Sequence, residues 1–167
     1  MKPRVTIAQL AAADGAEFVA AARASRRLHA AWVAPPLTPA DYQAKLLRTQ
    51  APLNYGLGIR RIDSGALVGY VGVTNVVRGN FLSAYLGYYA FAGHERQGLM
   101  TEGLKLVARH AFGTLGLHRL EANIQPDNLP SIALVRSCGF AKEGYSPRYL
   151  KIAGRWRDHE RWALLAR

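Results

Sequence analysis

The chain has 167 residues, half of them apolar, and carries 22 Lys or Arg against 11 Asp or Glu, which gives a net charge of +11. This length and composition predict one globular domain and exclude a disordered chain. No apolar run reaches the roughly 18 residues that a membrane span needs, so we expect no contact with a membrane.

The single cysteine and the N-terminal residues bear on the cellular compartment of the protein. Cys138 cannot form an internal disulfide, and no Cys/His cluster has metal-ligand spacing. The segment from Met1 to Thr6 lacks the apolar stretch of a signal peptide. We therefore expect a cytoplasmic protein that binds no metal.

The positive charge admits two interpretations. The charge would serve a polyanionic cofactor together with an anionic partner, and RNA or a ribonucleoprotein is the first candidate for that partner. However, the arginines are spread along the chain without the Lys/Arg run of a nucleic-acid tail, as in a generally basic surface. Both interpretations stay open at this stage.

The N-terminal third predicts a strand and two helices. Residues 5–10 alternate as a strand does, and a helix follows from Asp14, a good N-cap residue, to about Ser25. Thr38 as N-cap and Pro39 at the first helical position open a second helix, which runs to about residue 50.

The segment between these helices, residues 26–36, mixes cations with Trp32 and ends in Pro35-Pro36. This composition predicts a loop. Trp32 either borders a substrate there or anchors the core.

Three antiparallel strands are predicted next. Residues 54–61 and 67–77 flank Asp63-Ser64-Gly65 and form a hairpin, and a turn at residues 78–80 leads into a Tyr-rich strand at 84–91.

A polar turn followed by a helix occupies residues 94–112. Met100, Leu104, Val107 and Ala111 recur with a helical period. The first turn of a helix has backbone N–H groups without partners, and Gly98 removes the side chain that would keep a bulky anion away. The order strand, turn, helix therefore predicts a phosphate site. The Gly-Lys-Ser/Thr ending of a P-loop and the triple-glycine fingerprint are both missing, which weighs against a nucleotide-binding Rossmann fold.

The last third predicts two further strands around a short helix, then a closing strand. Residues 120–124 alternate and should pair beside the Tyr-rich strand through a right-handed crossover. A helix over 132–138 ends at Gly139, where a left-handed cap belongs. Residues 140–152 and 155–165 flank Ala153-Gly154 as a hairpin.

Several of these motifs resemble the GNAT acetyltransferases. Residues 95–100 stand in the place of the family's acyl-CoA pyrophosphate loop, Gln/Arg-x-x-Gly-x-Gly/Ala, although only Gly98 matches strictly. Asn128 and Ser131 match the family's Asn-x-x-Ser helix start, with Gly139-Phe140 in register behind them. The Gly-Arg-Trp-Arg-Asp-His segment at 154–159 is similar to the RimJ/RimL branch, the ribosomal-protein-alanine N-acetyltransferases. The resemblance covers residues 54–165 well and is thin before them.

The resemblance implies the fold. It predicts one GNAT acetyltransferase domain over residues 1–167, an α/β (α+β) fold. Its mixed, mostly antiparallel sheet of about seven strands should be flanked by about four helices. Strands 4 and 5 should splay apart to admit the pantetheine arm of the cofactor.

The resemblance also implies acetyl-CoA as cofactor, with no metal. The backbone of the Tyr-rich strand would bind it, the turn would wrap its pyrophosphate, and Asn128 would bind pantetheine or else only cap its helix. The cofactor-binding residues expected in this way are Tyr88, Tyr89, Ala90, Glu95, Arg96, Gln97, Gly98, Leu99, Met100, Thr101 and Asn128.

For catalysis, the resemblance places Ser131 as the acid that protonates the departing thiol, with a plain helix-start serine as the alternative. Val135 stands where many family members have a tyrosine for that role. The base is left open among Glu102, Glu121 and Glu143, with Glu102 expected to pair on its own helix. Trp32, Tyr145 and Trp156 are expected to line the substrate site.

The function implied is acetyl transfer from acetyl-CoA to the N-terminal α-amine of a protein, most simply a ribosomal protein beginning with Ala or Ser. One alternative keeps the fold and takes a small amine or antibiotic, and an acidic pocket would favour a polyamine. A second alternative is a non-catalytic module that binds RNA or the ribosome through its basic surface. The sequence leaves open whether the protein is a monomer or a homodimer.

Overall fold

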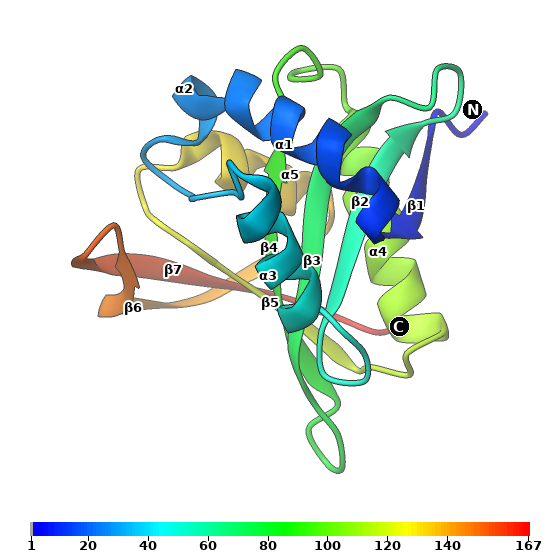
Figure 1. Cartoon of the computed structure of the whole chain (residues 1–167). Coiled ribbons are helices and arrows are strands. Elements are labelled where there is room, and N and C mark those ends of the chain that lie inside the picture. The colour runs from blue at the N-terminus through cyan, green and yellow to red at the C-terminus, as the bar shows by residue number, and fades with distance from the viewer. Residues whose placement is uncertain (1) are drawn as a thin grey trace.

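A computed structural model describes residues 2–167. It contains one seven-stranded sheet in the order β1-β2-β3-β4-β5-β7-β6, with helices on both faces (Figure 1). The strands are β1 (Val5–Gln9), β2 (Tyr55–Arg61), β3 (Leu67–Val77), β4 (Ser83–Ala90), β5 (Arg119–Ile124), β6 (Ala141–Ile152) and β7 (Arg155–Leu165). The helices are the 3₁₀ helix η1 (Ala12–Asp14) and α1 (Gly15–Ala24), α2 (Arg26–His29), α3 (Pro39–Arg48), α4 (Leu99–Gly113) and α5 (Leu129–Ser137).

This architecture confirms the predicted mixed α/β fold with seven strands. All neighbouring strands are antiparallel except β4 and β5, which run parallel because the crossover helix α4 joins them. Within the described residues, five α-helices flank the sheet where about four were expected. Within residues 2–167, no helix combines the length and the apolarity that crossing a membrane requires.

The core lies in two layers, one on each face of the sheet. Figure 1 shows α1 and α3 on the viewer's side of the strands and α4 behind them. The predicted stripe of α4 faces the sheet, since Leu104, Val107 and Ala111 are fully buried in the larger cluster. On the opposite face the second cluster contains Phe18, Tyr42, Tyr70 of β3 and Phe91 just after β4, and Tyr89 packs against it.

Strands β4 and β5 separate after a short contact. Only Ser83, Ala84 and Tyr85 pair with β5, at residues 119–121. Beyond Tyr85, β4 pairs with β3 alone, while β5 continues along β7. The predicted splay between the fourth and fifth strands is therefore present, and one backbone edge of β4 faces the gap without a strand partner.

The helix ends follow the sequence signals in most places. Thr38 Oγ1 accepts a hydrogen bond from Asp41 N at 3.1 Å, as expected of an N-cap. Gly139 has a φ of +90°, and the bonds from Gly139 N to Arg136 O and from Phe140 N to Val135 O complete a Schellman cap.

One local prediction holds in position only, and another is wrong. Asp14 is the N-cap residue of α1 as predicted, but its carboxylate makes no cap bond: it accepts from Ala11 N at 2.8 Å and pairs with Arg60 at 2.7 Å. Residues 26–29, expected as a loop, form the short helix α2. Burial explains α2, because His29 is 4% exposed and its Nε2 lies 2.6 Å from Ala90 O, so tertiary packing outweighs the polar local sequence.

Candidate active site

The turn before α4 presents unpaired backbone N–H groups. Gly98 is the N-cap residue, in the left-handed region at φ +74°, and the first hydrogen bond of the helix runs from Glu102 N to Gly98 O at 3.1 Å. The amides of Leu99, Met100 and Thr101 precede that bond and are available to an anion. The positive end of the helix dipole adds to their attraction, so the predicted turn fits a diphosphate.

Arg4, just before β1, braces this turn. Its Nη1 donates to Gln97 O at 3.0 Å, and its Nε lies 3.0 Å from Glu102 Oε2. The Arg4 backbone N also donates to Glu102 Oε1, at 2.6 Å, and these bonds hold the pKa of the Glu102 carboxyl below its usual value. Glu102 therefore pairs with the first strand and not on its own helix, which corrects the expectation from sequence. Local spacing could not reveal a partner 98 residues away.

The two residues that depart from the family pattern of the turn are accommodated by their neighbours. Glu95 Oε2 accepts from Gly93 N at 2.7 Å, so its carboxylate is bonded to the preceding turn. Met100 packs over Gly69 of β3, where an added Cβ would lie 2.5 Å from the Met100 sulfur. The bulk of Met100 is thus compensated by a residue without a side chain on the facing strand.

A hydroxyl pair lies at the gap between β4 and α5. Tyr88 Oη is 2.7 Å from Ser131 Oγ, and burial raises the pKa of Tyr88 well above its usual value of 10. The sequence assigned only the backbone of Tyr88 to the site. Alternation along β4 could have placed its side chain on the α4 face, but nothing local indicated Ser131 as its partner.

Asn128 is the N-cap of α5. Its Oδ1 accepts from Ser131 N at 3.3 Å, so the capping role weighed from sequence is present. The cap uses only the amide oxygen, and the Nδ2 group keeps two donors for another partner.

None of the three carboxylates considered as a base is poised for that role. Glu121 and Glu143 both pair with Arg119, from either side, and Arg119 holds the pKa of the Glu143 carboxyl below its usual value. Glu102 is bound to Arg4 as described above. A carboxylate of depressed pKa is a weak proton acceptor near neutral pH.

The three expected substrate-lining residues lie on two parts of the chain. Trp32 follows α2 and is half-buried, whereas Tyr145 and Trp156 lie exposed on the β6–β7 hairpin. The Tyr145 hydroxyl is hydrogen-bonded to Asp158, whose other oxygen accepts from Arg148 N at 2.7 Å. Asp158 therefore stabilises the hairpin.

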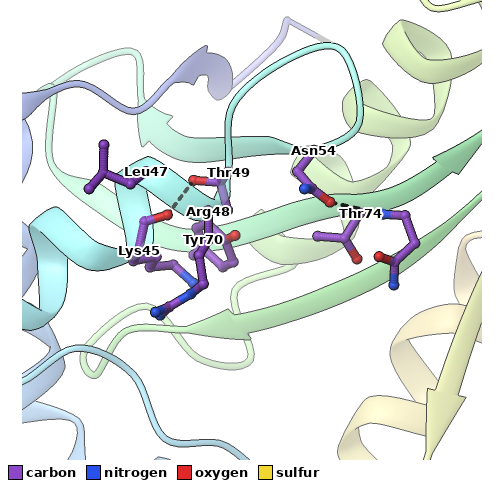
Figure 2. Close-up of a pocket in the computed structure, with 8 residues that line it drawn as sticks. Lys45, Leu47, Arg48, Thr49, Asn54, Tyr70 and Thr74 are labelled. Atoms are coloured by element: carbon purple, nitrogen blue, oxygen red, sulfur yellow. Dashed lines mark hydrogen bonds between the residues drawn. The ribbon is translucent and has the colours of Figure 1, made fainter.

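A pocket that the sequence did not indicate opens between α3 and β3 (Figure 2). Its volume is about 610 Å³. The Lys45 ammonium lies 3.8 Å above the ring of Tyr70, which stacks on Tyr89 at 5.1 Å. The lining contains two cations and no carboxylate: Lys45, Leu47, Arg48, Thr49, Asn54, Tyr70, Thr74 and Asn75. Across residues 2–167, no three His, Cys, Asp or Glu side chains are grouped to hold a metal ion.

Comparison with known proteins places this arrangement in a family. The Acetyltransferase (GNAT) domain description matches residues 4–141. The chain is 38% identical over 131 residues to the ribosomal protein uS5-alanine N-acetyltransferase of Escherichia coli, and 37% identical over 125 residues to the probable N-acetyltransferase YjcK of Bacillus subtilis. Each of these matches covers 75% of this chain and 67% of the relative.

Solved structures agree with this placement. Mycobacterium smegmatis RimJ in complex with CoA-disulfide superposes with a TM-score of 0.89 at 26% identity, over 97% of this chain and 82% of that chain. From these matches, together with the anion-binding turn and the splayed strands, we conclude that the chain belongs to the GNAT family and is an acetyl-CoA-dependent N-acetyltransferase.

Proposed function

We propose that this enzyme acetylates the N-terminal α-amine of a protein, most simply a ribosomal protein beginning with Ala or Ser. The observation that carries the proposal is that all three candidate bases are held in ion pairs. An α-amine with a pKa of about 7.7–8.0 is roughly 10–15% neutral at pH 7, whereas a lysine near 10.4 is about 0.04% neutral. A site whose three candidate carboxylates are all paired suits the α-amine, and the similarity to the uS5-alanine enzyme supports the same acceptor.

The cofactor fits the residues present. In this proposal the turn from Glu95 to Thr101 holds the diphosphate through the N–H groups of Leu99, Met100 and Thr101. The open edge of β4 at Tyr88, Tyr89 and Ala90 offers backbone groups to the pantetheine arm, and Asn128 Nδ2 donates to it. Acetyl-CoA, when bound, supplies the acetyl thioester.

Ser131 and Tyr88 act on the leaving-group side. In this mechanism Tyr88 donates to Ser131 Oγ, so that the hydroxyl proton of Ser131 is directed to the departing sulfur. The Tyr88 hydroxyl is protonated at neutral pH, since burial raises its pKa above the usual value, so it can act as the donor to Ser131. Donors placed where charge develops stabilise the transition state more than the ground state.

The small-amine alternative stays a second candidate, because the pocket between α3 and β3 shares no lining residue with the Tyr88 and Ser131 site and its charge does not describe the amine site. We keep the cytoplasm as the site of action, where ribosomal proteins meet acetyl-CoA. Ribosome or RNA contact through the +11 surface is compatible with this activity.

The deciding experiment is an acetyl-CoA consumption assay against a panel of peptides and small amines. Peptides beginning with Ala or Ser are expected to be turned over, and spermidine or aminoglycosides are not. Turnover of small amines with the peptides untouched would replace this proposal by the small-amine alternative. Failure of every acceptor to react would leave only a binding function.

A further inference from the structure

The pocket between α3 and β3 holds a cation without a counter-ion. Lys45 Nζ lies 3.8 Å from the centroid of the Tyr70 ring and 5.7 Å from that of Tyr89. Among residues 2–167, no carboxylate forms an ion pair with Lys45 or Arg48, although arginines elsewhere on the surface are paired. The tyrosine faces attract the ammonium, but less strongly than a carboxylate would.

This environment is unfavourable for a lone ammonium. Burial first, and the neighbouring charge of Arg48 second, lower the pKa of Lys45 to about 8. An anion entering the pocket would relieve both effects, because it would replace the lost solvation and offset the like charge. The neutral side chains around the cations, Thr74 and Asn54 among them, can donate hydrogen bonds to such an anion.

We propose that this pocket binds the carboxylate of an acidic side chain in the acceptor polypeptide, downstream of the amine that is acetylated. Lys45 and Arg48 are the recognising residues. The inference rests on the proposed function and deepens it, since it defines a second determinant of the acceptor besides its Ala or Ser start.

The place of the pocket in the fold supports an acceptor segment. Tyr70 of β3 is paired with Tyr89 of β4, and the preceding residue, Tyr88, carries the hydroxyl bonded to Ser131. Successive side chains of a strand point to opposite faces, so the pocket and the Ser131 site lie on two sides of the same strand. A polypeptide whose amine reaches the gap beside β4 can extend along the α3 face.

A carboxylate side chain suits this recess better than an RNA phosphate. Lys45 is partly buried between α3 and β3, and a flexible Glu or Asp side chain can enter such a depression. The phosphates of an RNA helix are fixed to a broad backbone and require a convex or grooved basic surface.

The test uses peptides that begin with Ala and differ only by Glu or Gln at one position, scanned along the segment. For the wild-type enzyme we expect kcat/KM about tenfold higher for the Glu peptide at one or two positions, mainly through KM. Arg48→Gln and Lys45→Met should each reduce this preference at least threefold. Arg109→Gln removes an exposed arginine from α4 and should leave the preference unchanged.

Two further measurements, peptide calorimetry and an RNA-binding assay of Arg48→Gln, keep the outcomes distinct. Calorimetry with the same peptides carrying a blocked N-terminus reads binding without turnover. If the Glu peptides bind more strongly than the Gln peptides, but neither is acetylated when its N-terminus is unblocked, the pocket is upheld and the N-terminal function is refuted. Acetylation with equal kcat/KM for Glu and Gln at all positions would overturn the pocket alone. A Glu preference that survives in Arg48→Gln would also overturn the pocket, because Arg48 is exposed and this variant should fold. Loss of RNA binding in that variant, with peptide kinetics unchanged, would overturn the pocket as well.

Discussion

Tyr88 Oη on β4 and Ser131 Oγ at the start of α5 lie 2.7 Å apart, so one hydrogen bond joins the two walls of the gap in the sheet. Ser131 is held a second time through its backbone N–H by Asn128. Ser131 is thus held through its backbone by an N-cap and through its hydroxyl by a tyrosine. A group fixed in this way needs little reorganisation when charge develops on the leaving sulfur.

Replacing Ser131 by Ala should lower kcat more than it changes KM for acetyl-CoA. A donor to the leaving thiolate acts mostly in the transition state, so its removal affects the chemical step. Steady-state kinetics with an Ala-starting peptide measures both constants. A fall of less than about threefold, or roughly 0.7 kcal/mol, would make Ser131 a helix-start residue only.

Tyr88→Phe should also lower kcat, but by a smaller factor, since the tyrosine acts through Ser131. In the Ser131→Ala background the same change should have little further effect, because the two residues act as one unit. Tyr85→Phe, on the exposed part of the same strand, is the matched control. Additive losses in the double variant would show that Tyr88 does not act through Ser131.

Gly98→Val should weaken acetyl-CoA binding severely while the fold largely persists. A side chain at this position fills the space beside the unpaired amides and is strained at φ +74°. Gly79→Val separates the two effects, because Gly79 has a φ of +72° in an open turn away from the site. Calorimetry should find a lost affinity for Gly98→Val only, with similar changes in thermal stability for both.

Glu102→Gln should lower stability at pH 7 by about 1 kcal/mol, because the hydrogen bonds from Arg4 and Val5 lose their charged acceptor. The pKa of this carboxyl is lowered in the folded state, so its contribution is present above about 4.5, the usual value, and is lost as the pH falls further. Melting curves of the two proteins should therefore converge in acid. A difference that grows below pH 4 would contradict this assignment.

A peptide with an Ala or Ser start and an internal lysine should be acetylated at the α-amine alone. The neutral fraction of the amines gives over a hundredfold preference at pH 7. The charge of +11 repels a basic ribosomal protein at long range, so attraction must come from local acidic groups or bound RNA and should fade with salt. Mass spectrometry that locates acetyl groups on lysine side chains would refute the preference.

The regular parts of this fold are visible in the sequence because they depend on local periodicity. Leu104, Val107 and Ala111 mark the buried face of α4, and Gly139 marks the end of α5. The polar residues of α2 indicate a loop, whereas burial of His29 against Ala90 of β4 favours the helix.

The site residues likewise fall into two groups: those that a short motif identifies and those whose contacts join distant parts of the chain. Gly98 and Ser131 are found from short motifs, since their roles depend on a turn and a helix start. The side-chain contacts of Tyr88 and Glu102 join elements that are distant in the chain, and no local pattern encodes such partners. The charge of the pocket at Lys45 and Arg48 likewise needs α3 and β3 in place.

The bracing of the turn by Arg4 makes the coenzyme site depend on the edge of the sheet. Strand β1 pairs with β2 alone, and edge strands open locally at a lower free energy than central ones. Opening of this edge breaks the bonds to Gln97 and Glu102 and so loosens the turn. Closure of β1 and occupancy of the turn are therefore linked equilibria, and by reciprocity each must favour the other by the same factor.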